Sequence, residues 1–140
     1  MPKDFLLSAT VEIKAPFHDV DMMGVVWHGH YVRYLEIARC ALLDKIDYNY
    51  PQMKESGYAW PVIDLRVRYP GSILFSQVVS VTAYLVEWEN RLKIDYEIRN
   101  AEGKRVTKGY TVQVAVNMEE GEMCMASPDV LLEKLGLKEA

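Results

Sequence analysis

Long apolar runs and blocks of basic residues are both missing from this chain of 140 residues. No apolar run approaches the roughly 20 residues that span a bilayer, and residues 1–14 lack the long apolar segment of a signal peptide. The net charge is −4, whereas a nucleic-acid-binding face needs concentrated positive charge. We therefore expect no membrane segment, no nucleic-acid partner and a cytoplasmic location.

Cysteine and histidine are scarce. The two cysteines, Cys40 and Cys124, are too few for a disulfide framework. Half of the residues are hydrophobic and 26% are charged, which is typical of a soluble globular protein. The chain has no internal repeat, low-complexity tract or linker, so we expect one domain over residues 1–140.

Hydrophobic periodicity predicts one strand, one long helix and four further strands. Residues 9–15 alternate between apolar and polar side chains, which indicates a strand. From Gly29 to near Asp44 the apolar spacing is three to four, which indicates a helix of about 15 residues. Its apolar stripe consists of Tyr31, Tyr34, Leu35, Ala38, Leu42 and Ile46. Later strands are expected over 63–69, 79–85, 92–98 and 106–116, with turns at 70–71, 88–90 and 100–103.

Two segments remain outside this pattern. Residues 48–57 contain proline and glycine and are expected to form the connection after the long helix, with one short helical turn. Residues 127–135 begin with Ser-Pro-Asp, which predicts a final helix with proline at its first position.

One helix of about 15 residues covers only part of one face of a five-stranded sheet. We therefore expect a homodimer in which two sheets pair edge to edge.

The candidate site lies between His18 and Arg39, a segment that holds Asp21 and all three histidines. Asp21 precedes the expected helix start, where free backbone N–H groups and a partial positive charge favour an anion. A carboxylate can act as nucleophile or general base, and helix N–H groups can hold an oxyanion. This combination suits chemistry on a carbonyl group. The structural alternative for Asp21 is an Asx turn.

The same segment carries a motif. From Asp19 to Arg39 it reads D-x-D-x-x-G-V-V-x-H-x-x-Y-x-x-Y-x-E-x-A-R. This pattern resembles the acyl-CoA thioesterases of the hotdog fold, in particular the group around 4-hydroxybenzoyl-CoA thioesterase and the Tol-Pal-associated acyl-CoA thioesterases. The resemblance extends from Thr10 to about Met118 and implies an α+β hotdog fold, with a five-stranded antiparallel sheet wrapped around one long central helix. It also implies a homodimer or homotetramer with active sites between subunits.

The resemblance implies roles for residues at the helix start. Asp21 matches the catalytic aspartate of that group, and His28 matches the position whose backbone N–H polarises the thioester carbonyl. Gly29 is a second candidate donor at the substrate. His30 departs from the pattern, which more often has asparagine there. Its side chain either shapes the substrate site or assists the chemical step.

Other side chains are candidates for substrate binding or for packing. Met22, Tyr31, Tyr34 and Trp60 are expected either to shape an acyl pocket or to pack in the core. Basic residues near strand ends are candidates for the phosphates of coenzyme A, although such side chains are commonly only solvated. They are Arg91, Lys93, Arg99, Lys104 and Arg105.

The remaining polar residues of the segment are given structural roles. Asp19 is expected to accept hydrogen bonds in the loop, and Cys40 to be a buried structural thiol. Glu36 occupies a position where another hotdog branch keeps a catalytic glutamate, but here an ion pair with Arg33 or Arg39 is expected. The spacing of the histidines and aspartates matches no standard metal pattern, so we expect neither metal nor cofactor.

The sequence thus predicts hydrolysis of an acyl-CoA thioester to a free carboxylic acid and coenzyme A. Two alternatives stay open, namely a thioesterase that acts on acyl-acyl-carrier-protein and a non-catalytic acyl-thioester-binding protein. A hotdog dehydratase is disfavoured because its helix histidine stands in a different surrounding motif. The sequence does not set the length or aromatic character of the acyl group.

Overall fold

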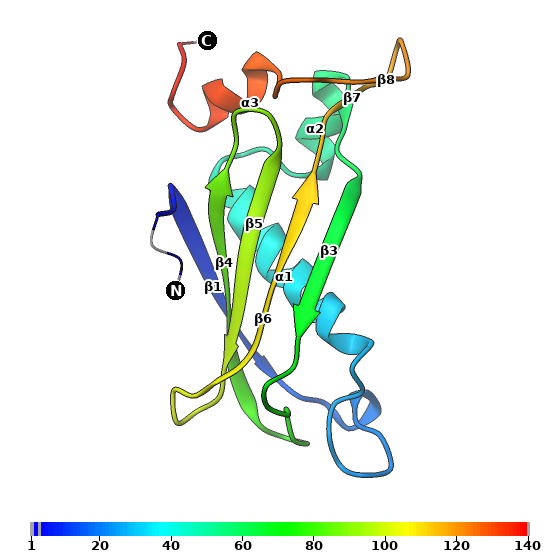
Figure 1. Cartoon of the computed structure of the whole chain (residues 1–140), viewed down its shortest axis with the longest axis vertical. Helices are drawn as coiled ribbons and strands as arrows, with labels where there is room; N and C mark the ends of the chain where they lie inside the picture. The colour runs from blue at the N-terminus through cyan, green and yellow to red at the C-terminus, as the bar shows by residue number, and fades with distance from the viewer. Residues whose placement is uncertain (1, 3, 140) are drawn as a thin grey trace.

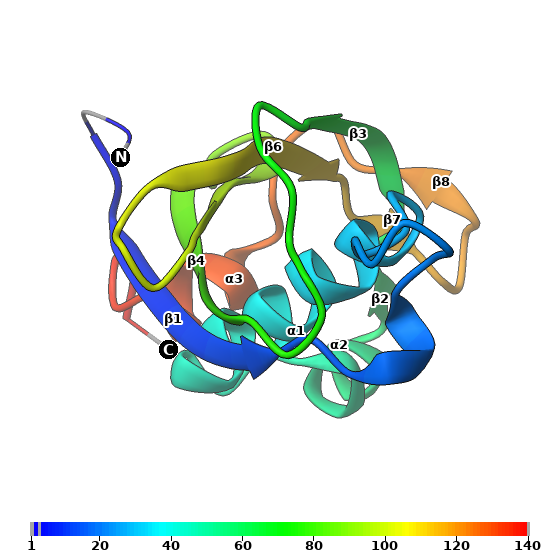
Figure 2. The same cartoon turned by 90° about the horizontal axis from the view of Figure 1, so that it is seen from below.

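A curved antiparallel sheet wraps around one long helix in the computed structural model, which describes residues 2 and 4–139 (Figures 1 and 2). The five strands lie in the order β1-β4-β5-β6-β3. This arrangement confirms the expected α+β class and hotdog architecture. The elements are β1 (Leu7–Lys14), α1 (His30–Lys45), β3 (Val62–Arg68), β4 (Val78–Glu87), β5 (Leu92–Arg99) and β6 (Arg105–Gln113).

The apolar stripe of α1 forms the centre of the core. Tyr34, Leu35, Ala38 and Leu42 are at most 1% exposed, and α1 packs most closely against β1 and β4. Inward-facing residues of the sheet complete the core because alternate side chains of a strand point to the same face. They include Val79, Val81, Ala83, Leu85, Ile94 and Ile98.

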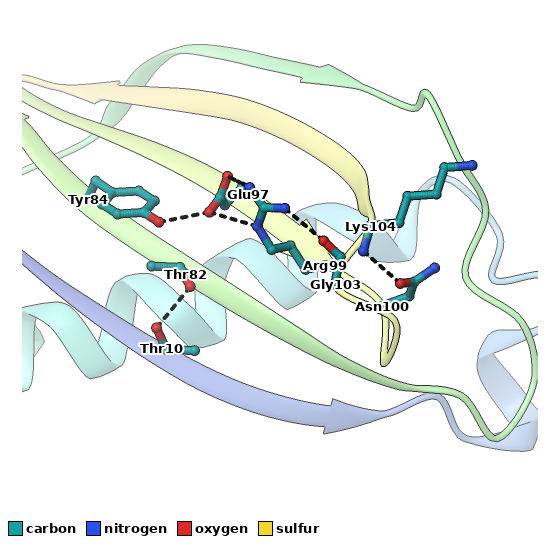
Figure 3. A network of polar contacts seen from close by, with 8 residues as sticks. All are labelled: Thr10, Thr82, Tyr84, Glu97, Arg99, Asn100, Gly103 and Lys104. Atoms are coloured by element: carbon teal, nitrogen blue, oxygen red, sulfur yellow. Dashed lines mark hydrogen bonds and ion pairs between the residues drawn. The ribbon is translucent and has the colours of Figure 1, made fainter. Parts of the chain in front are cut away.

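The outer face of the sheet is polar and carries a buried acid (Figure 3). Glu97 accepts hydrogen bonds from the Tyr84 hydroxyl at 2.8 Å and from Arg99 at 3.2 and 3.3 Å. Arg99 also donates to the Gly103 carbonyl at 2.8 Å. Nearby, the hydroxyls of Thr10 and Thr82 lie 2.8 Å apart and join β1 to β4. Because Arg99 is held by these contacts, it is less available to a phosphate than the sequence suggested.

Strand β3 carries apolar side chains that α1 does not cover. Ile63 and Leu65 stand at alternate positions of β3, as expected for residues of an inward face. Nevertheless, Ile63 is 57% exposed and Leu65 is 43% exposed. Strand β3 pairs only with β6 among the described strands, so its other edge is open. The opposite edge strand, β1, exposes Thr10, Glu12 and Lys14 instead. The apolar edge is therefore at β3.

Three expectations about secondary structure require correction. The strand expected over 106–116 ends at Gln113, and β7 (Val116–Asn117) joins β2 (Tyr58–Ala59) and β8 (Glu122–Met123) in a second, small sheet. The connection over 48–57 holds a seven-residue helix, α2 (Tyr50–Ser56), which Asn49 and Gln52 cap at its N-terminus. Pro128 caps α3 (Asp129–Lys134) rather than occupying its first turn.

Within the described residues, no helix is both long and apolar enough to cross a membrane.

Candidate active site

Asp19 fixes the loop that precedes α1. Its side chain is buried and accepts hydrogen bonds from Arg33 and from the Tyr34 hydroxyl, the latter at 2.6 Å. Its backbone carbonyl accepts from the Trp27 N–H at 3.0 Å. Burial alone would raise the pKa of Asp19, but the hydrogen bonds from Tyr34 and Arg33 hold it below its ordinary value. The expectation that Asp19 is a hydrogen-bond acceptor in the loop is confirmed.

We expect the Asp19 carboxylate to make the fold sensitive to acid. Because its folded-state pKa lies below the ordinary value of about 3.8, its stabilisation is complete above that pH and is lost as the pH falls through the folded-state pKa. Urea unfolding gives the free energy of unfolding at pH 6 and at pH 2. Between these two pH values the parent should lose about 1–3 kcal/mol more of this free energy than Asp19→Asn. Equal losses in the two proteins would contradict this role.

Asp21 lies in a tight hairpin between Val20 and Val26, which form an isolated bridge. Its backbone N–H donates to the Val25 carbonyl at 2.9 Å, and its Oδ1 accepts from the Met23 N–H at 2.8 Å. The side chain is exposed, and Oδ2 makes no hydrogen bond to a described residue. The Asx turn is therefore present, and it holds the carboxylate while leaving one oxygen available for chemistry.

The start of α1 offers free backbone donors. The helix begins at His30, and Gly29 stands before it with helical angles (φ −65°, ψ −23°) and no side-chain cap. The N–H of His30 donates to the Trp27 carbonyl at 2.9 Å, and that of Tyr31 to the His28 carbonyl at 3.3 Å. The N–H groups of His28 and Gly29 have no acceptor among the described residues. They are therefore free to donate to a ligand, and their role as oxyanion donors stays a prediction.

Aromatic rings surround these donors. The Trp27 ring lies 5.1 Å from the His28 ring and 5.4 Å from the His30 ring, measured between centroids. It also lies against Gly29, where an added Cβ would come within 2.2 Å of the indole. The Tyr69 hydroxyl reaches the His28 carbonyl at 3.4 Å. Tyr69 follows β3 and was missed from the sequence, because nothing local signals a contact across 41 residues.

Exposed apolar side chains border the Asp21 hairpin. Phe17 and Phe75 meet edge to face at 5.9 Å between centroids, and the Phe75 N–H donates to the Gly24 carbonyl at 3.1 Å. Met22 is fully exposed, and its role at the acyl group stays a prediction. We call this group the apolar rim; it consists of Phe17, Met22, Met23, Leu74 and Phe75.

A separate cavity of about 570 Å³ lies along the last turns of α1. We call it the Trp60 cavity. It lies at the end of α1 opposite to the Asp21 hairpin, towards α2 and β7 (Figure 1). Trp60 itself is held by hydrogen bonds from its indole N–H to the Tyr48 hydroxyl at 3.0 Å and from Gln113 to its carbonyl at 2.8 Å. Apolar lining comes from Leu43, Met53, Tyr58, Trp60, Val116 and Met118.

Other candidates fall into structural roles or lie elsewhere. Tyr31 is 3% exposed and its hydroxyl accepts from the Ile73 N–H at 3.1 Å, so packing explains it within one chain. Arg91 pairs with Glu87 at 2.6 Å in the β4–β5 turn, away from Asp21. Glu36 pairs with Arg39, which confirms the expected ion pair.

The expectation for Cys40 was wrong. Its thiol is exposed and lines the Trp60 cavity, whereas a buried position was expected. Cys40 is two residues after the buried Ala38, which turns it about 200° away from the apolar stripe. Among the described residues, no three histidine, cysteine or acidic side chains gather at metal-binding distance.

Comparison with known proteins places this chain in a family. Residues 15–135 match the model of the thioesterase-like superfamily. The chain belongs to that superfamily. A DHNA-CoA thioesterase from Staphylococcus aureus has 29% sequence identity and a TM-score of 0.77, with coverage of 91% of this chain and 82% of the other. The class of enzyme expected from the sequence, a thioesterase, is confirmed.

Two further structures share the thioesterase-like fold. The hypothetical protein TT1821 from Thermus thermophilus is 28% identical, with a TM-score of 0.80 over 92% of this chain and 98% of that one. Slr0204 of Synechocystis, a 1,4-dihydroxy-2-naphthoyl-CoA thioesterase, is 18% identical, with a TM-score of 0.81 over 92% of this chain and 96% of that one. The second likeness concerns the fold alone.

Proposed function

We propose that the protein hydrolyses acyl-CoA thioesters, with Asp21 as nucleophile or general base and the N–H groups of His28 and Gly29 as oxyanion donors. The observation that carries this proposal is the uncapped start of α1, preceded in the chain by a hairpin that holds an exposed carboxylate. The D-x-D motif with this helix start also supports placement near the 4-hydroxybenzoyl-CoA and Tol-Pal-associated thioesterases.

The carboxylate has two possible routes. As a nucleophile, Asp21 attacks the carbonyl carbon, the C–S bond breaks, coenzyme A leaves as the thiolate, and water hydrolyses the resulting anhydride. As a general base, it takes a proton from the attacking water and returns it to the departing thiolate. Both routes place negative charge on the carbonyl oxygen, where loss of one N–H donor typically costs about 3 to 4 kcal/mol of barrier.

A dimer through β3 would bring the two ends of the molecule together. Antiparallel pairing of two β3 strands about Leu65 places the start of one strand opposite the end of the other. Trp60 and the cavity precede β3, and Tyr69, which contacts His28, follows it. The Trp60 cavity of one protomer would therefore face the helix start of its partner. We propose that this cavity receives the acyl group.

Thioester cleavage on a panel of substrates tests the function. The panel contains acyl-CoAs of graded chain length, an aromatic series with 1,4-dihydroxy-2-naphthoyl-CoA, and one acyl-acyl-carrier-protein. The aromatic series follows from the DHNA-CoA thioesterase relative. Cleavage of only the carrier-protein substrate would shift the proposal to that alternative. Tight binding without cleavage of any substrate would favour the non-catalytic alternative.

We expect His30→Asn to change substrate preference more than the chemical step. The His30 ring packs edge to face on Trp27 beside the proposed donors. Relative kcat/KM values among acyl groups should change, while kcat for the best substrate stays within about tenfold of the parent. If kcat collapses for every substrate and one limb of the pH profile disappears, His30 is an acid or base instead.

A further inference from the structure

A shallow hollow of about 390 Å³ lies on the outer face of the sheet, between β3, β6, β5 and β4. We call it the outer hollow. Its polar residues alternate with the inward-facing core residues, so they lie on the side opposite to α1. Although the protein carries a net charge of −4, five of the residues around the outer hollow are basic and two are acidic. The basic ones are Arg66, Arg68, Lys93, Arg105 and Lys108.

Most of this positive charge is uncompensated. Arg66, Arg68, Arg105 and Lys108 make no ion pair or hydrogen bond to a described side chain. By contrast, arginines elsewhere in the protein, such as Arg33 and Arg91, have carboxylate partners. A set of unpaired cations in a concave site is a ready anion-binding arrangement.

Two of the cations directly oppose each other. Arg68 on β3 and Lys108 on β6 are cross-strand partners in the antiparallel register. Like charges at such positions destabilise a sheet. Glu97 on β5 opposes Lys108 on its other side, but it is shared with Tyr84 and Arg99, so an anion held between Arg68 and Lys108 would add stability. Beside it, the Lys93 ammonium lies 4.8 Å from the centroid of the Tyr110 ring, which adds an aromatic surface to the outer hollow.

The two acids of the outer hollow differ in their surroundings. Glu97 already accepts hydrogen bonds from Tyr84 and Arg99 (Figure 3). Asp95 is half-buried, and burial raises its pKa. Its carboxyl group favours a ligand that also carries a hydroxyl or amino donor, which inorganic phosphate at neutral pH offers poorly and a nucleoside offers well.

We propose that the outer hollow binds a nucleotide, with phosphate oxygens on Arg66, Arg68 and Lys108 and with Asp95 accepting from the ribose or the base. Arginine suits this role because its guanidinium can bind phosphate through two parallel hydrogen bonds. The volume of the hollow lies within the usual range for small-ligand sites.

The nucleotide has two possible sources, a free nucleotide or the nucleotide end of coenzyme A. The second source rests on the proposed function. Binding of coenzyme A would need the outer hollow and the start of α1 to lie near each other in the chain. Arg68 of the hollow is followed directly by Tyr69, whose hydroxyl contacts the His28 carbonyl. Bisphosphate binding and the KM values of acyl-CoA and acyl-pantetheine together separate the two sources.

Calorimetric titration with adenosine 3′,5′-bisphosphate tests the site without any catalysis. We expect saturable binding to the parent and at least tenfold weaker binding to Arg68→Gln/Lys108→Gln and to Arg66→Gln. Lys14→Gln/Lys54→Gln removes the same two charges at exposed positions outside the hollow and should bind like the parent. Absence of saturable binding to the parent, or equal affinity in all four proteins, would overturn the proposal.

Thermal unfolding supplies a second readout that a merely solvated patch would not give. Without ligand, Arg68→Gln/Lys108→Gln should unfold close to the temperature of the parent, because it removes both the Arg68–Lys108 repulsion and the Lys108–Glu97 attraction. With the bisphosphate, the parent should gain thermal stability and this variant should not. Equal shifts in both proteins on adding ligand would count against the site.

Kinetics then identifies the source. If the ligand is coenzyme A, Arg68→Gln/Lys108→Gln should raise KM at least tenfold for an acyl-CoA but leave KM unchanged for the matching acyl-pantetheine. If the ligand is a free nucleotide, both KM values should match the parent while bisphosphate binding is still lost. A protein that cleaves no thioester but binds the bisphosphate as described would refute the proposed function and retain the site.

Discussion

Replacing Asp21 with asparagine should lower kcat for thioester hydrolysis at least a hundredfold. The amide cannot act as a base or as an effective nucleophile, and removal of such a group typically costs 10²- to 10⁴-fold. The Asx turn should survive, because the asparagine carbonyl can accept from the Met23 N–H as Oδ1 does. Steady-state kinetics on the best acyl-CoA of the panel provides the measurement.

The control for this substitution is Glu12→Gln, which removes an exposed carboxylate from β1. Its kcat should equal that of the parent. Circular dichroism and sedimentation of Asp21→Asn should also match the parent, so that a loss of activity is not a loss of fold. A kcat within tenfold of the parent would remove Asp21 from the catalytic role.

Replacing Leu65 with lysine should separate the proposed dimer and abolish most of the activity. The substitution places a charge on the apolar face of the open β3 edge, where Leu65 is 43% exposed in the single chain. Sedimentation should change from twice the chain mass to the 16.1 kDa of one chain. Because each site is proposed to need both protomers, kcat/KM should fall at least a hundredfold.

Leu137→Lys is the matched control, since Leu137 is 50% exposed beyond α3. It should leave both mass and activity unchanged. A parent that sediments as a monomer at micromolar concentration would refute the dimer and the intersubunit site together. A monomeric Leu65→Lys variant with parental kcat/KM would refute only the shared site.

The sequence was most informative where a single period extends over many residues. The stripe from Tyr31 to Leu42 predicted α1 to within one residue at each end, because only a helix brings that spacing onto one face. The alternation over 92–98 likewise predicted β5. Asp21 was found for a different reason, since a motif marked it before any contact was known.

The parts that escaped prediction depend on contacts between distant residues. Strands β2, β7 and β8 have two residues each, too few to show a period. The break after Gln113 occurs within a pattern of valines at alternate positions that extends to Val116, and it has no local signal. Tyr69 reaches His28, and Arg68 opposes Lys108, only because the sheet brings them together.

The pairing of β1 with β4 also has a consequence for synthesis on the ribosome. Thr10 and Thr82 are hydrogen-bonded across 72 residues, so the first strand to be made must wait for the fourth. Until β4 has emerged, the apolar stripe of α1 has only part of its cover. At about 5–20 residues per second, the interval between completion of α1 and of β4 is on the order of a few seconds. During that time the nascent chain presents the surface that chaperones bind.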